Sequence, residues 1–265
     1  MNVTAMTIAG SDPSGGAGLQ ADLKTFQQFG VYGCSAVSLL TVQNTLGVEH
    51  VEVMDPELVV RQIRAIVSDL PMHAAKTGAL GSEAVIRAVA KEAAGFDFPL
   101  IVDPVMVSKH GHPLLPEAAM AALREELLPK AFLITPNRHE AAALLGRKLE
   151  GAADLRQAVL ELTELGPEHV LLKGGREGDE NVDLLCHQGE CLEFRAAHFD
   201  TPHLHGSGCV LAAAITAELA RGQTLRSAIH HAKSFVTQAM VHGRALGRGM
   251  QPLNLFVPPH PHPHN

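Results

Sequence analysis

Residues 3–29 read VTAMTIAGSDPSGGAGLQADLKTFQQF, and this stretch decides the fold. Its first residues form a run of apolar and β-favouring side chains, which is typical of a buried strand. From position 18 to position 29, apolar residues recur at three- and four-residue spacing, as in a helix that lies on a sheet. A glycine-rich loop joins the two. A strand, a loop and a helix in this order form the first half of a βαβ unit, which predicts a parallel sheet.

The same alternation of strand and helix patterns continues along the chain. Further buried strands are predicted over 34–42, 50–54, 74–79, 99–105, 131–135 and 169–174. Amphipathic helices are predicted over 56–70, 82–94, 116–128, 138–145 and 154–165, and two last helices from Gly208 and from about Thr224 to Gly243. A late antiparallel hairpin is predicted over 181–187 and 190–196. We therefore predict an α/β fold with a mainly parallel central sheet.

Length and composition restrict the classes of protein to consider. A chain of 265 residues is long enough for one sizeable α/β domain, and we predict a single domain over 1–257 and a loose Pro/His tail over 258–265. The net charge is −7, with one tyrosine, no tryptophan and no run of basic residues, which argues against a nucleic-acid partner. No apolar run approaches the ~20 residues that span a bilayer, and no basic segment precedes the first apolar residues. We expect a soluble, cytoplasmic protein with no membrane partner.

Four cysteines are too few and too scattered for a disulfide scaffold in a chain of this length. Cys186 and Cys191 flank the predicted hairpin turn and could face each other across it. Because the chain is expected to be cytoplasmic, we predict that both thiols stay reduced.

Ligands of an open parallel sheet collect at the carboxyl ends of the strands, where polar segments fall in this chain. The loop GSDPSGGAG, residues 10–18, opens the first helix, and its glycines let backbone amides approach a ligand. The alternative is a plain tight turn. The loop matches neither a P-loop nor a clean G-x-G-x-x-G dinucleotide motif.

Charged residues follow three other strands. Asp103 and Glu140 are candidates to bind Mg²⁺ through oxygen atoms beside a polyphosphate. Alternatively, Glu140 complements a helix dipole and Asp103 is a turn residue before Pro104. Lys173 ends the strand HVLLKG and supplies a point charge for a bulky anion, unless it is merely solvated.

The segment HGSGC precedes the alanine-rich helix that begins near Gly208. The amides of Gly206, Ser207, Gly208 and Cys209 would lie at the positive end of that helix, which predicts an anion hole for a transferring phosphoryl group. The same field would lower the pKa of the Cys209 thiol, and a thiolate there could accept the proton of a substrate hydroxyl. The alternative is a small cysteine that fills the first helical turn.

Six motifs in order resemble those of the hydroxymethylpyrimidine/phosphomethylpyrimidine kinases of thiamine biosynthesis, in the ribokinase-like superfamily. They are IAGSDPSGGAGLQADLKTF, TVQNTLGV, VDPVMVSKHGHPLL, LITPNRHEAAALLG, VLLKGG and HGSGC, and they span nearly the whole chain. The resemblance implies a three-layer α/β/α ribokinase-like fold and a homodimer. It implies transfer of the γ-phosphate of ATP, with Mg²⁺, to the hydroxymethyl group of 4-amino-5-hydroxymethyl-2-methylpyrimidine. In many members the monophosphate is then phosphorylated to the diphosphate.

The resemblance also implies roles for individual residues. Gln43 would hold the aminopyrimidine, because a carboxamide pairs an acceptor with a donor as the amino group and ring nitrogen do. Gly10, Ala17 and Val105 would line the rest of the substrate pocket, and His205 would contact a substrate phosphate. Asp103 and Glu140 match the positions near Mg²⁺, Lys173 the phosphate-contacting lysine, and Cys209 the residue that replaces the catalytic aspartate of related sugar kinases.

Several positions depart from the family's pattern. His203 and Leu204 replace an Asn-Thr pair, Ser207 replaces a threonine, Ala79 replaces a common methionine, and His110 occupies a lid position. The main alternative is a pyridoxal kinase of the same superfamily, since Ala79 leaves space for a pyridoxal ring. A non-catalytic nucleotide-binding protein would not be expected to retain Asp103, Glu140, Lys173 and Cys209 together.

Overall fold

The computed structural model describes residues 3–108 and 111–259. Most of the predicted Pro/His tail and the lid position at His110 lie outside these described residues.

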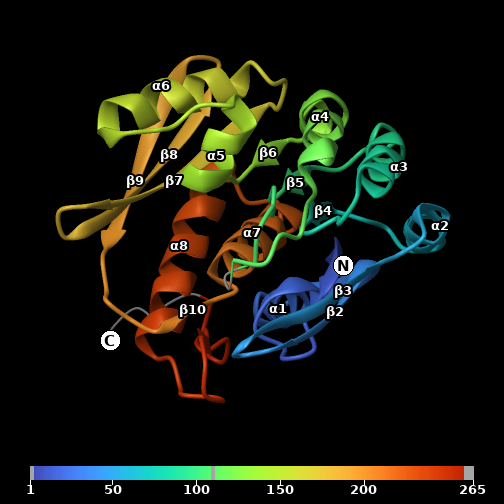
Figure 1. Cartoon of the computed structure of the whole chain (residues 1–265), viewed down its shortest axis with the longest axis horizontal. Coiled ribbons are helices and arrows are strands. Elements are labelled where there is room, and N and C mark those ends of the chain that lie inside the picture. The colour runs from blue at the N-terminus through green and yellow to red at the C-terminus, as the bar shows by residue number, and fades with distance from the viewer. Residues whose placement is uncertain (1–2, 109–110, 260–265) are drawn as a thin grey trace.

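The core of the structure is a nine-stranded sheet in the order β3-β2-β1-β4-β5-β6-β7-β8-β9 (Figure 1). Strands β2, β1, β4, β5, β6 and β7 run parallel, while β3 and β8 pair antiparallel with their neighbours and β9 pairs antiparallel with β8. A small parallel pair, β10 and β11, lies apart from the sheet. The strands are β1 Thr4–Ser11, β2 Tyr32–Asn44, β3 Gly47–Val53, β4 Ala74–Thr77, β5 Leu100–Val102, β6 Leu133–Ile134, β7 His169–Glu177, β8 Glu180–His187, β9 Glu190–Ala197, β10 His203–His205 and β11 Gln251–Pro252.

Helices connect the strands, and α2, α3, α5 and α8 begin at residues whose side chains cap them. Asp55 accepts two backbone amides at the start of α2, and Ser82 and Thr224 each accept one at α3 and α8. The helices are α1 Gly18–Gln28, α2 Pro56–Val67, α3 Glu83–Ala93, α4 Met120–Ala122, α5 Arg138–Leu145, α6 Gly151–Thr163, α7 Ser207–Ala220 and α8 Leu225–Val241.

The prediction of one regular α-helix over 116–128 is wrong. The segment 116–128 forms a 3-10 turn, the short α4, a π-helical stretch over Leu123–Leu127 and a second 3-10 turn over Leu128–Lys130. Pro129 has no amide to donate and its ring crowds the preceding turn, so a regular α-helix cannot continue through it.

Two apolar clusters show that helices cover both faces of the sheet. Along β1, Met6 and Ile8 belong to a cluster with α2 to α6, whereas Ala5 belongs to a second cluster with α1, α7 and α8. Because successive side chains of a strand point to opposite faces, this division defines three layers. The expected α/β/α ribokinase-like architecture with a mainly parallel sheet is confirmed.

The strand order reverses at β1, because the chain proceeds from β1 to β2 on one side and continues with β4 on the other. Such a switch point leaves a crevice at the carboxyl ends of the strands. The loops after β1 and β5, which carry Ala17, Asp103 and Val105, open into it. Glu140 lies in α5 after β6, and Lys173 lies within β7.

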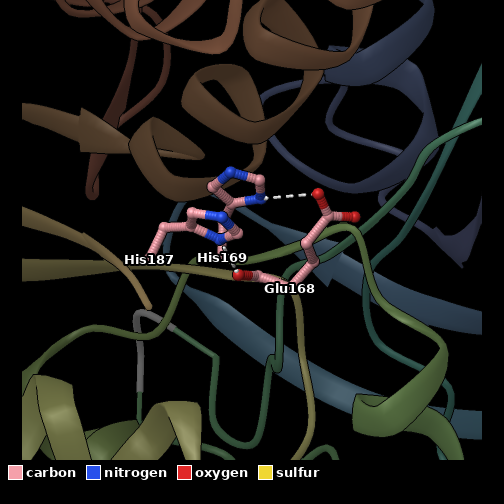
Figure 2. A group of neighbouring side chains, drawn as sticks. All are labelled: Glu168, His169 and His187. Carbon is pink, nitrogen blue, oxygen red and sulfur yellow. Dashed lines mark hydrogen bonds and ion pairs between the residues drawn. The ribbon is translucent and has the colours of Figure 1, made fainter. Parts of the chain in front are cut away.

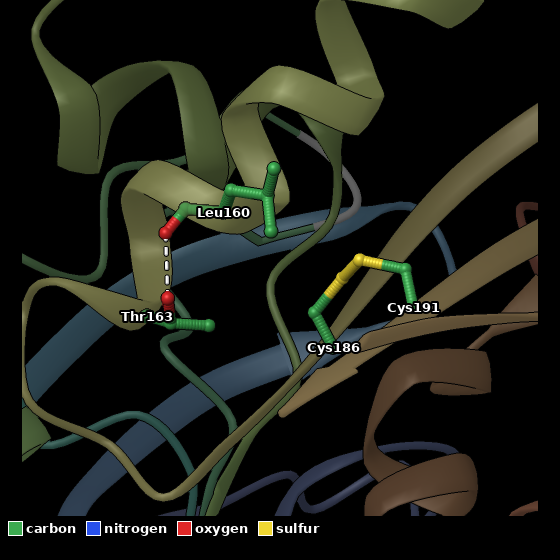
Figure 3. The surroundings of a disulfide bond; sticks show 4 residues. All are labelled: Leu160, Thr163, Cys186 and Cys191. Atoms are coloured by element: carbon green, nitrogen blue, oxygen red, sulfur yellow. Dashed lines mark hydrogen bonds between the residues drawn. A yellow bond between two sulfur atoms is a disulfide. The ribbon is translucent and has the colours of Figure 1, made fainter. Parts of the chain in front are cut away.

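The predicted hairpin is formed by β8 and β9, and it contains a disulfide. Cys186 pairs directly with Cys191 in the strand register, with Cα atoms 4.3 Å apart, and their sulfur atoms are bonded (Figure 3). The prediction that these thiols stay reduced is therefore wrong for this structure, because the two-residue turn between the strands places them directly opposite each other. The bond lies beside Leu160 and Thr163 of α6 (Figure 3).

Within the described residues, no helix combines the length and apolar character needed to cross a membrane.

Candidate active site

Asp12 organises the glycine-rich loop after β1. Its Oδ1 accepts the amide and the hydroxyl of Ser14 at 2.9 and 2.7 Å, and its Oδ2 accepts the amide of Ala17 at 2.8 Å. His205 Nε2 lies 2.8 Å from the same Oδ2. This buried carboxylate therefore ties the loop to β10, and motif reasoning did not single it out.

These contacts change the acidity of Asp12. Burial alone would raise the pKa of Asp12, but hydrogen bonds from His205 and Ser14 and the charge of His205 outweigh it and lower the pKa to about 2. Because the folded-state pKa lies below the ordinary value of 3.8, Asp12 contributes stability above pH 4 and loses it as the pH falls toward 2.

We expect Asp12→Asn to lose about 2 kcal/mol of unfolding free energy at pH 7, the equivalent of the pKa shift. About half of the difference from wild type should remain at pH 3, because the carboxyl is then largely protonated in the unfolded chain. Urea unfolding of both proteins at the two pH values measures this. A difference that stays the same at pH 3 would show that the loss does not come from the ionised carboxylate.

The start of α7 faces the same crevice. Gly206 caps the helix in the left-handed region with φ 80°, and Ser207, Gly208 and Cys209 form the first turn without a side-chain cap. A Cβ placed on Gly208 would lie 3.5 Å from Lys173 Nζ and 3.8 Å from Asp103 Oδ2. The predicted anion hole, the lysine and the first carboxylate are thus brought together.

The Lys173 ammonium lies close to both predicted metal ligands, Asp103 and Glu140. Its Nζ lies 3.2 Å from Asp103 Oδ1 and 4.0 Å from Glu140 Oε2. The alternative of a solvated lysine is wrong, since only 17% of its side chain is exposed. Burial disfavours the ammonium, but the charges of Asp103 and Glu140 outweigh it and raise the pKa of Lys173.

The two carboxylates are held by different elements. Asp103 follows β5, is buried, and accepts the hydroxyl of Thr135 at 3.1 Å. Glu140 Oε2 accepts the Asn137 amide at 2.7 Å and completes a capping box at the start of α5. The helix-start role of Glu140 is therefore confirmed, and it also fixes the carboxylate beside Lys173.

The predicted effect of the helix dipole on Cys209 is wrong. Removal from water, followed by the negative charges of Asp22 and Asp103, raises the pKa of Cys209 to about 12. The charge of Lys76 and a hydrogen bond from the Gly18 amide act in the opposite direction without prevailing. At neutral pH the group is a thiol, although the residue keeps part of its surface exposed.

Asp22 and Lys76 were not predicted as site residues. They form an ion pair of 2.8 Å in which both side chains are fully buried. The sequence did contain a signal: Asp22 lies on the apolar face of its helix, and Lys76 lies within a buried strand.

The predicted substrate residues lie around His205 and Asp103. Gln43 Nε2 is 3.4 Å from His205 Nε2, and Ala17 caps α1 beside Asp12. Gly10 lies near the end of β1, and the Val105 amide donates to the Asp103 carbonyl at 2.8 Å. The structure therefore places these residues at the end of the sheet where the parallel strands have their carboxyl ends.

A second group of titratable residues, Glu168, His169 and His187, lies at the opposite end of β7 (Figure 2). The two imidazole rings are stacked with centroids 4.2 Å apart and an interplanar angle of 16°. A metal ion lies close to the plane of each imidazole that binds it, and two parallel stacked rings do not share such a position. Both Nδ1 atoms contact backbone carbonyls, of Phe132 and Glu168. The arrangement is a cross-strand stack and not a preformed metal centre.

Comparisons with known proteins identify the family of this chain. The model of the phosphomethylpyrimidine kinase family matches residues 12–254. A hydroxymethylpyrimidine/phosphomethylpyrimidine kinase from Synechococcus elongatus is 46% identical over 96% of this chain and 97% of its own. The chloroplastic thiamine biosynthetic bifunctional enzyme of Arabidopsis thaliana is 42% identical over 93% of this chain and 48% of its own.

Solved structures of two kinases are also similar. The ADP complex of Bacillus subtilis pyridoxal kinase superposes with a TM-score of 0.88 at 36% identity, covering 96% of this chain and 97% of that one. A phosphomethylpyrimidine kinase from Clostridium difficile gives a TM-score of 0.80 at 38% identity, covering 90% of this chain and 99% of that one. With a family match over nearly its whole length, this chain belongs to the phosphomethylpyrimidine kinase family.

Proposed function

We propose that this enzyme transfers the γ-phosphate of ATP to the hydroxymethyl group of 4-amino-5-hydroxymethyl-2-methylpyrimidine and then phosphorylates the monophosphate to the diphosphate, in thiamine biosynthesis. The observation that carries the proposal is the convergence of Lys173, Asp103 and the amino end of α7 on one crevice. Gln43, near the carboxyl end of β2, lies in contact with His205.

The phosphate would be held by Lys173 and the backbone amides of Ser207, Gly208 and Cys209. Transfer of a phosphoryl group depends on positioning and charge stabilisation more than on a strong base. The amides supply fixed partial positive charge, and Lys173 remains cationic because carboxylates surround it. Both groups stabilise the negative charge on the equatorial oxygens of the transferring group.

Asp103 and Glu140 fit a magnesium ion. Both offer carboxylate oxygens near one Lys173 ammonium, at the edge of the sheet where the phosphates are expected, and Mg²⁺ takes such oxygens together with water. When bound there, Mg²⁺ would neutralise charge on the polyphosphate. The chain's own part is to hold the two carboxylates rigidly through Thr135 and the α5 cap.

The adenine site is assigned to a cavity of about 530 Å³ between β9 and α8. Lys233 lines this cavity and donates a hydrogen bond to Asp183. Asp183 on β8 lies directly opposite Lys173 on β7 in the strand register. A nucleotide whose terminal phosphate contacts Lys173 would therefore extend past Asp183 toward this cavity. Phe194 and His230 offer it flat surfaces for a base.

Gln43 is the proposed specificity residue for the aminopyrimidine. We expect Gln43→Ala to weaken binding of the pyrimidine alcohol by roughly 1–3 kcal/mol, because the amino group and ring nitrogen lose their partners in a closed pocket. The affinity for ATP should not change. Calorimetric titration of each ligand measures both values, with Asn44→Ala on the same strand as the control. An equal loss for both ligands would show that Gln43 is structural.

The substrate is tested by supplying the purified enzyme with ATP, Mg²⁺ and either the pyrimidine alcohol or pyridoxal. Mass spectrometry should detect the monophosphate and then the diphosphate of the pyrimidine, with slower turnover of pyridoxal. Pyridoxal kinase is the alternative, favoured by the similarity to the Bacillus subtilis enzyme. Fast turnover of pyridoxal with none of the pyrimidine would establish that alternative.

We further propose that residues 1–257 act as one kinase domain in a cytoplasmic homodimer. A single sheet joins β1 to β9, and Val257 still packs in the core, which supports one domain. Leu40, Val42 and Leu46 are exposed on the β2–β3 edge and offer an apolar surface to a second copy. The use of ATP as a substrate supports the cytoplasmic assignment. Sedimentation analysis of the purified protein tests the dimer.

A further inference from the structure

The carboxamide of Gln43 lies between two polar side chains that can fix its orientation. Gln43 Nε2 lies 3.4 Å from His205 Nε2, and Gln43 Oε1 lies 3.3 Å from Thr41 Oγ1. Thr41 and Gln43 are two residues apart on β2, so their side chains point to the same face of the sheet. Both contacts are long for hydrogen bonds, which indicates that donors and acceptors are not matched in this orientation.

The hydrogen on His205 Nε2 is already engaged by Asp12. The two side chains are buried, and His205 Nε2 lies 2.8 Å from Asp12 Oδ2. Asp12 also accepts the amide of Ala17 and the amide and hydroxyl of Ser14, which brings it to the four hydrogen bonds that an ionised carboxylate can accept. An ionised carboxylate only accepts, so Nε2 carries the hydrogen and points it at Asp12. The NH2 of Gln43 therefore meets a second donor at His205 Nε2.

The hydrogen on Thr41 is engaged in the same way. Thr41 Oγ1 donates to the carbonyl oxygen of Ser11 at 2.9 Å, and a hydroxyl has only one hydrogen. Thr41 can therefore only accept from Gln43, whereas Gln43 Oε1 needs a donor. Ser11 ends β1 and Asp12 follows it, so two consecutive residues fix the hydrogens on both neighbours of Gln43.

Both mismatches disappear when the carboxamide rotates by half a turn about its last bond. Its oxygen then accepts the hydrogen of His205 Nε2, and its NH2 donates to Thr41 Oγ1. The rotation needs little space, because the oxygen and the NH2 of a carboxamide have nearly the same shape. The His205 ring is also packed closely against the backbone of Gly16, where an added Cβ would lie only 2.4 Å from its Cδ2.

We propose that Asp12 is a positioning residue that acts through His205 to turn the Gln43 oxygen toward His205 and the Gln43 NH2 toward Thr41. This inference rests on the proposed function, which assigns Gln43 to the pyrimidine. A carboxamide that rotates freely pairs equally well with an amino group beside a ring nitrogen and with a carbonyl beside a ring N–H. Held in one orientation, it fixes the direction in which the substrate lies.

That direction decides where the alcohol points. In the substrate, carbon 4 carries the amino group and lies between ring nitrogen 3 and carbon 5, which carries the hydroxymethyl group. When the amino group pairs with an oxygen on the His205 side, the hydroxymethyl group lies on that side as well. His205 leads directly into Gly206 and the first turn of α7, where the phosphoryl group is expected. With the carboxamide reversed, the same alcohol would point toward Thr41.

The 4-oxo analogue of the substrate has the opposite pattern, because a carbonyl and a ring N–H replace the amino group and the ring nitrogen. It matches the fixed carboxamide only with its carbonyl on the Thr41 side, which turns its hydroxymethyl group away from His205. The two alcohols have nearly the same size. The site therefore discriminates between them by orientation, in the rate of phosphoryl transfer.

The test measures kcat/KM of wild type and Asp12→Asn for both alcohols. Wild type should prefer the amino alcohol about 100-fold or more, as a site built to match buried hydrogen bonds does. Asp12→Asn should reduce this preference by about tenfold or more, because an asparagine both donates and accepts and no longer fixes the hydrogen on His205. A change that only loosened the loop would lower both values alike. An unchanged preference in Asp12→Asn would overturn the proposal.

Two further variants separate positioning from stability of the loop. Ser14→Ala removes one hydrogen bond to Asp12 Oδ1 but leaves Oδ2 and His205 in place, so the preference should stay at the wild-type value. A loss as large as that of Asp12→Asn would contradict a specific role for Oδ2.

Thr41→Val acts from the other side of Gln43 and carries the test if Asp12→Asn does not fold. It removes the acceptor for the Gln43 NH2 with little change in shape. The preference should fall about 2- to 10-fold, the value of one neutral hydrogen bond. No change in the preference would contradict the proposed orientation.

Crystal structures with each alcohol and a non-hydrolysable ATP analogue distinguish failure of this inference from failure of the proposed function. The amino alcohol should direct its hydroxymethyl group toward Gly208, and the oxo alcohol should direct it toward Thr41. If the amino alcohol is phosphorylated but binds with its amino group on the Thr41 side, only the positioning role is lost. If wild type phosphorylates neither alcohol, the proposed function fails and this inference fails with it.

Discussion

Lys173→Met is expected to lower the turnover number by about 10²- to 10³-fold, the usual effect of removing a group that stabilises transition-state charge. Lys173 supplies the cation closest to both carboxylates and to the first turn of α7. Without it, the site loses a positive charge that opposes Asp103 and Glu140 beside the phosphate of ATP. Methionine fills nearly the same volume, so the change is mainly one of charge.

Steady-state kinetics with varied ATP and varied alcohol measures this effect. Breaking a buried ion pair leaves Asp103 without its partner and can cost roughly 3–5 kcal/mol of stability. Thermal unfolding of the variant should therefore be recorded, and the kinetics carried out well below its midpoint. The control is Lys130→Met, which removes an exposed lysine before β6, at the end of the sheet opposite to the site. Equal activity of the two variants would contradict a role for Lys173 at the phosphate.

The sequence predicts the architecture well because buried parallel strands and amphipathic helices have distinct periodicities. It also brings Asp103, Glu140, Lys173 and the HGSGC segment to one region, since each follows or adjoins a strand end. Their grouping needs only the rule that ligands bind at the carboxyl ends of parallel strands. The geometry of the group then follows from the strand order, which periodicity alone does not specify.

The acidity of Cys209 shows where local reasoning fails. A helix terminus is a local feature, and it lowers the pKa of a nearby thiol. The opposing contributions come from burial and from Asp22 and Asp103, which are far from Cys209 in the sequence. The sign of the shift therefore depends on tertiary structure. The bond between Cys186 and Cys191 likewise depends on the register of one hairpin, which the spacing of the two residues allows but does not fix.

Asp22 and Lys76 were missed for a different reason. Each sits inside a regular element, whereas most of the predicted site residues lie in loops or near the ends of strands. A charged residue on the buried face of a helix or within a buried strand needs a partner. Such misplaced charges are a usable signal in a single sequence, although it does not identify which two of them will pair.

Gly206→Ala is expected to nearly abolish activity, with a loss of 10³-fold or more in kcat/KM, and to destabilise the protein strongly. Two separate constraints act on this residue. Its φ of 80° lies in the left-handed region, which side chains disfavour. A Cβ would also lie only 1.9 Å from the carbonyl oxygen of Gly16, so the two loops would have to separate.

Separation of these loops would affect both halves of the site. Gly16 belongs to the loop that Asp12 organises and Ala17 ends, while Gly206 leads directly into the anion hole. Their close approach sets the distance between the substrate loop and the amides that hold the phosphate. A small misplacement of reacting groups can reduce a rate about 100-fold, and here both partners in the transfer would shift.

Gly222→Ala is the matched control, because it shares the positive φ but not the crowding. Gly222 follows α7 with φ 81°, and a Cβ there would meet no atom within 4 Å. That variant should lose only about 1–2 kcal/mol of stability, the cost of an alanine in the left-handed region, and keep its activity. Urea unfolding and kcat/KM of both variants separate the two constraints. If Gly206→Ala behaved like Gly222→Ala, the contact between the loops would not control the site; a much larger loss of activity at Gly206 would show that it does.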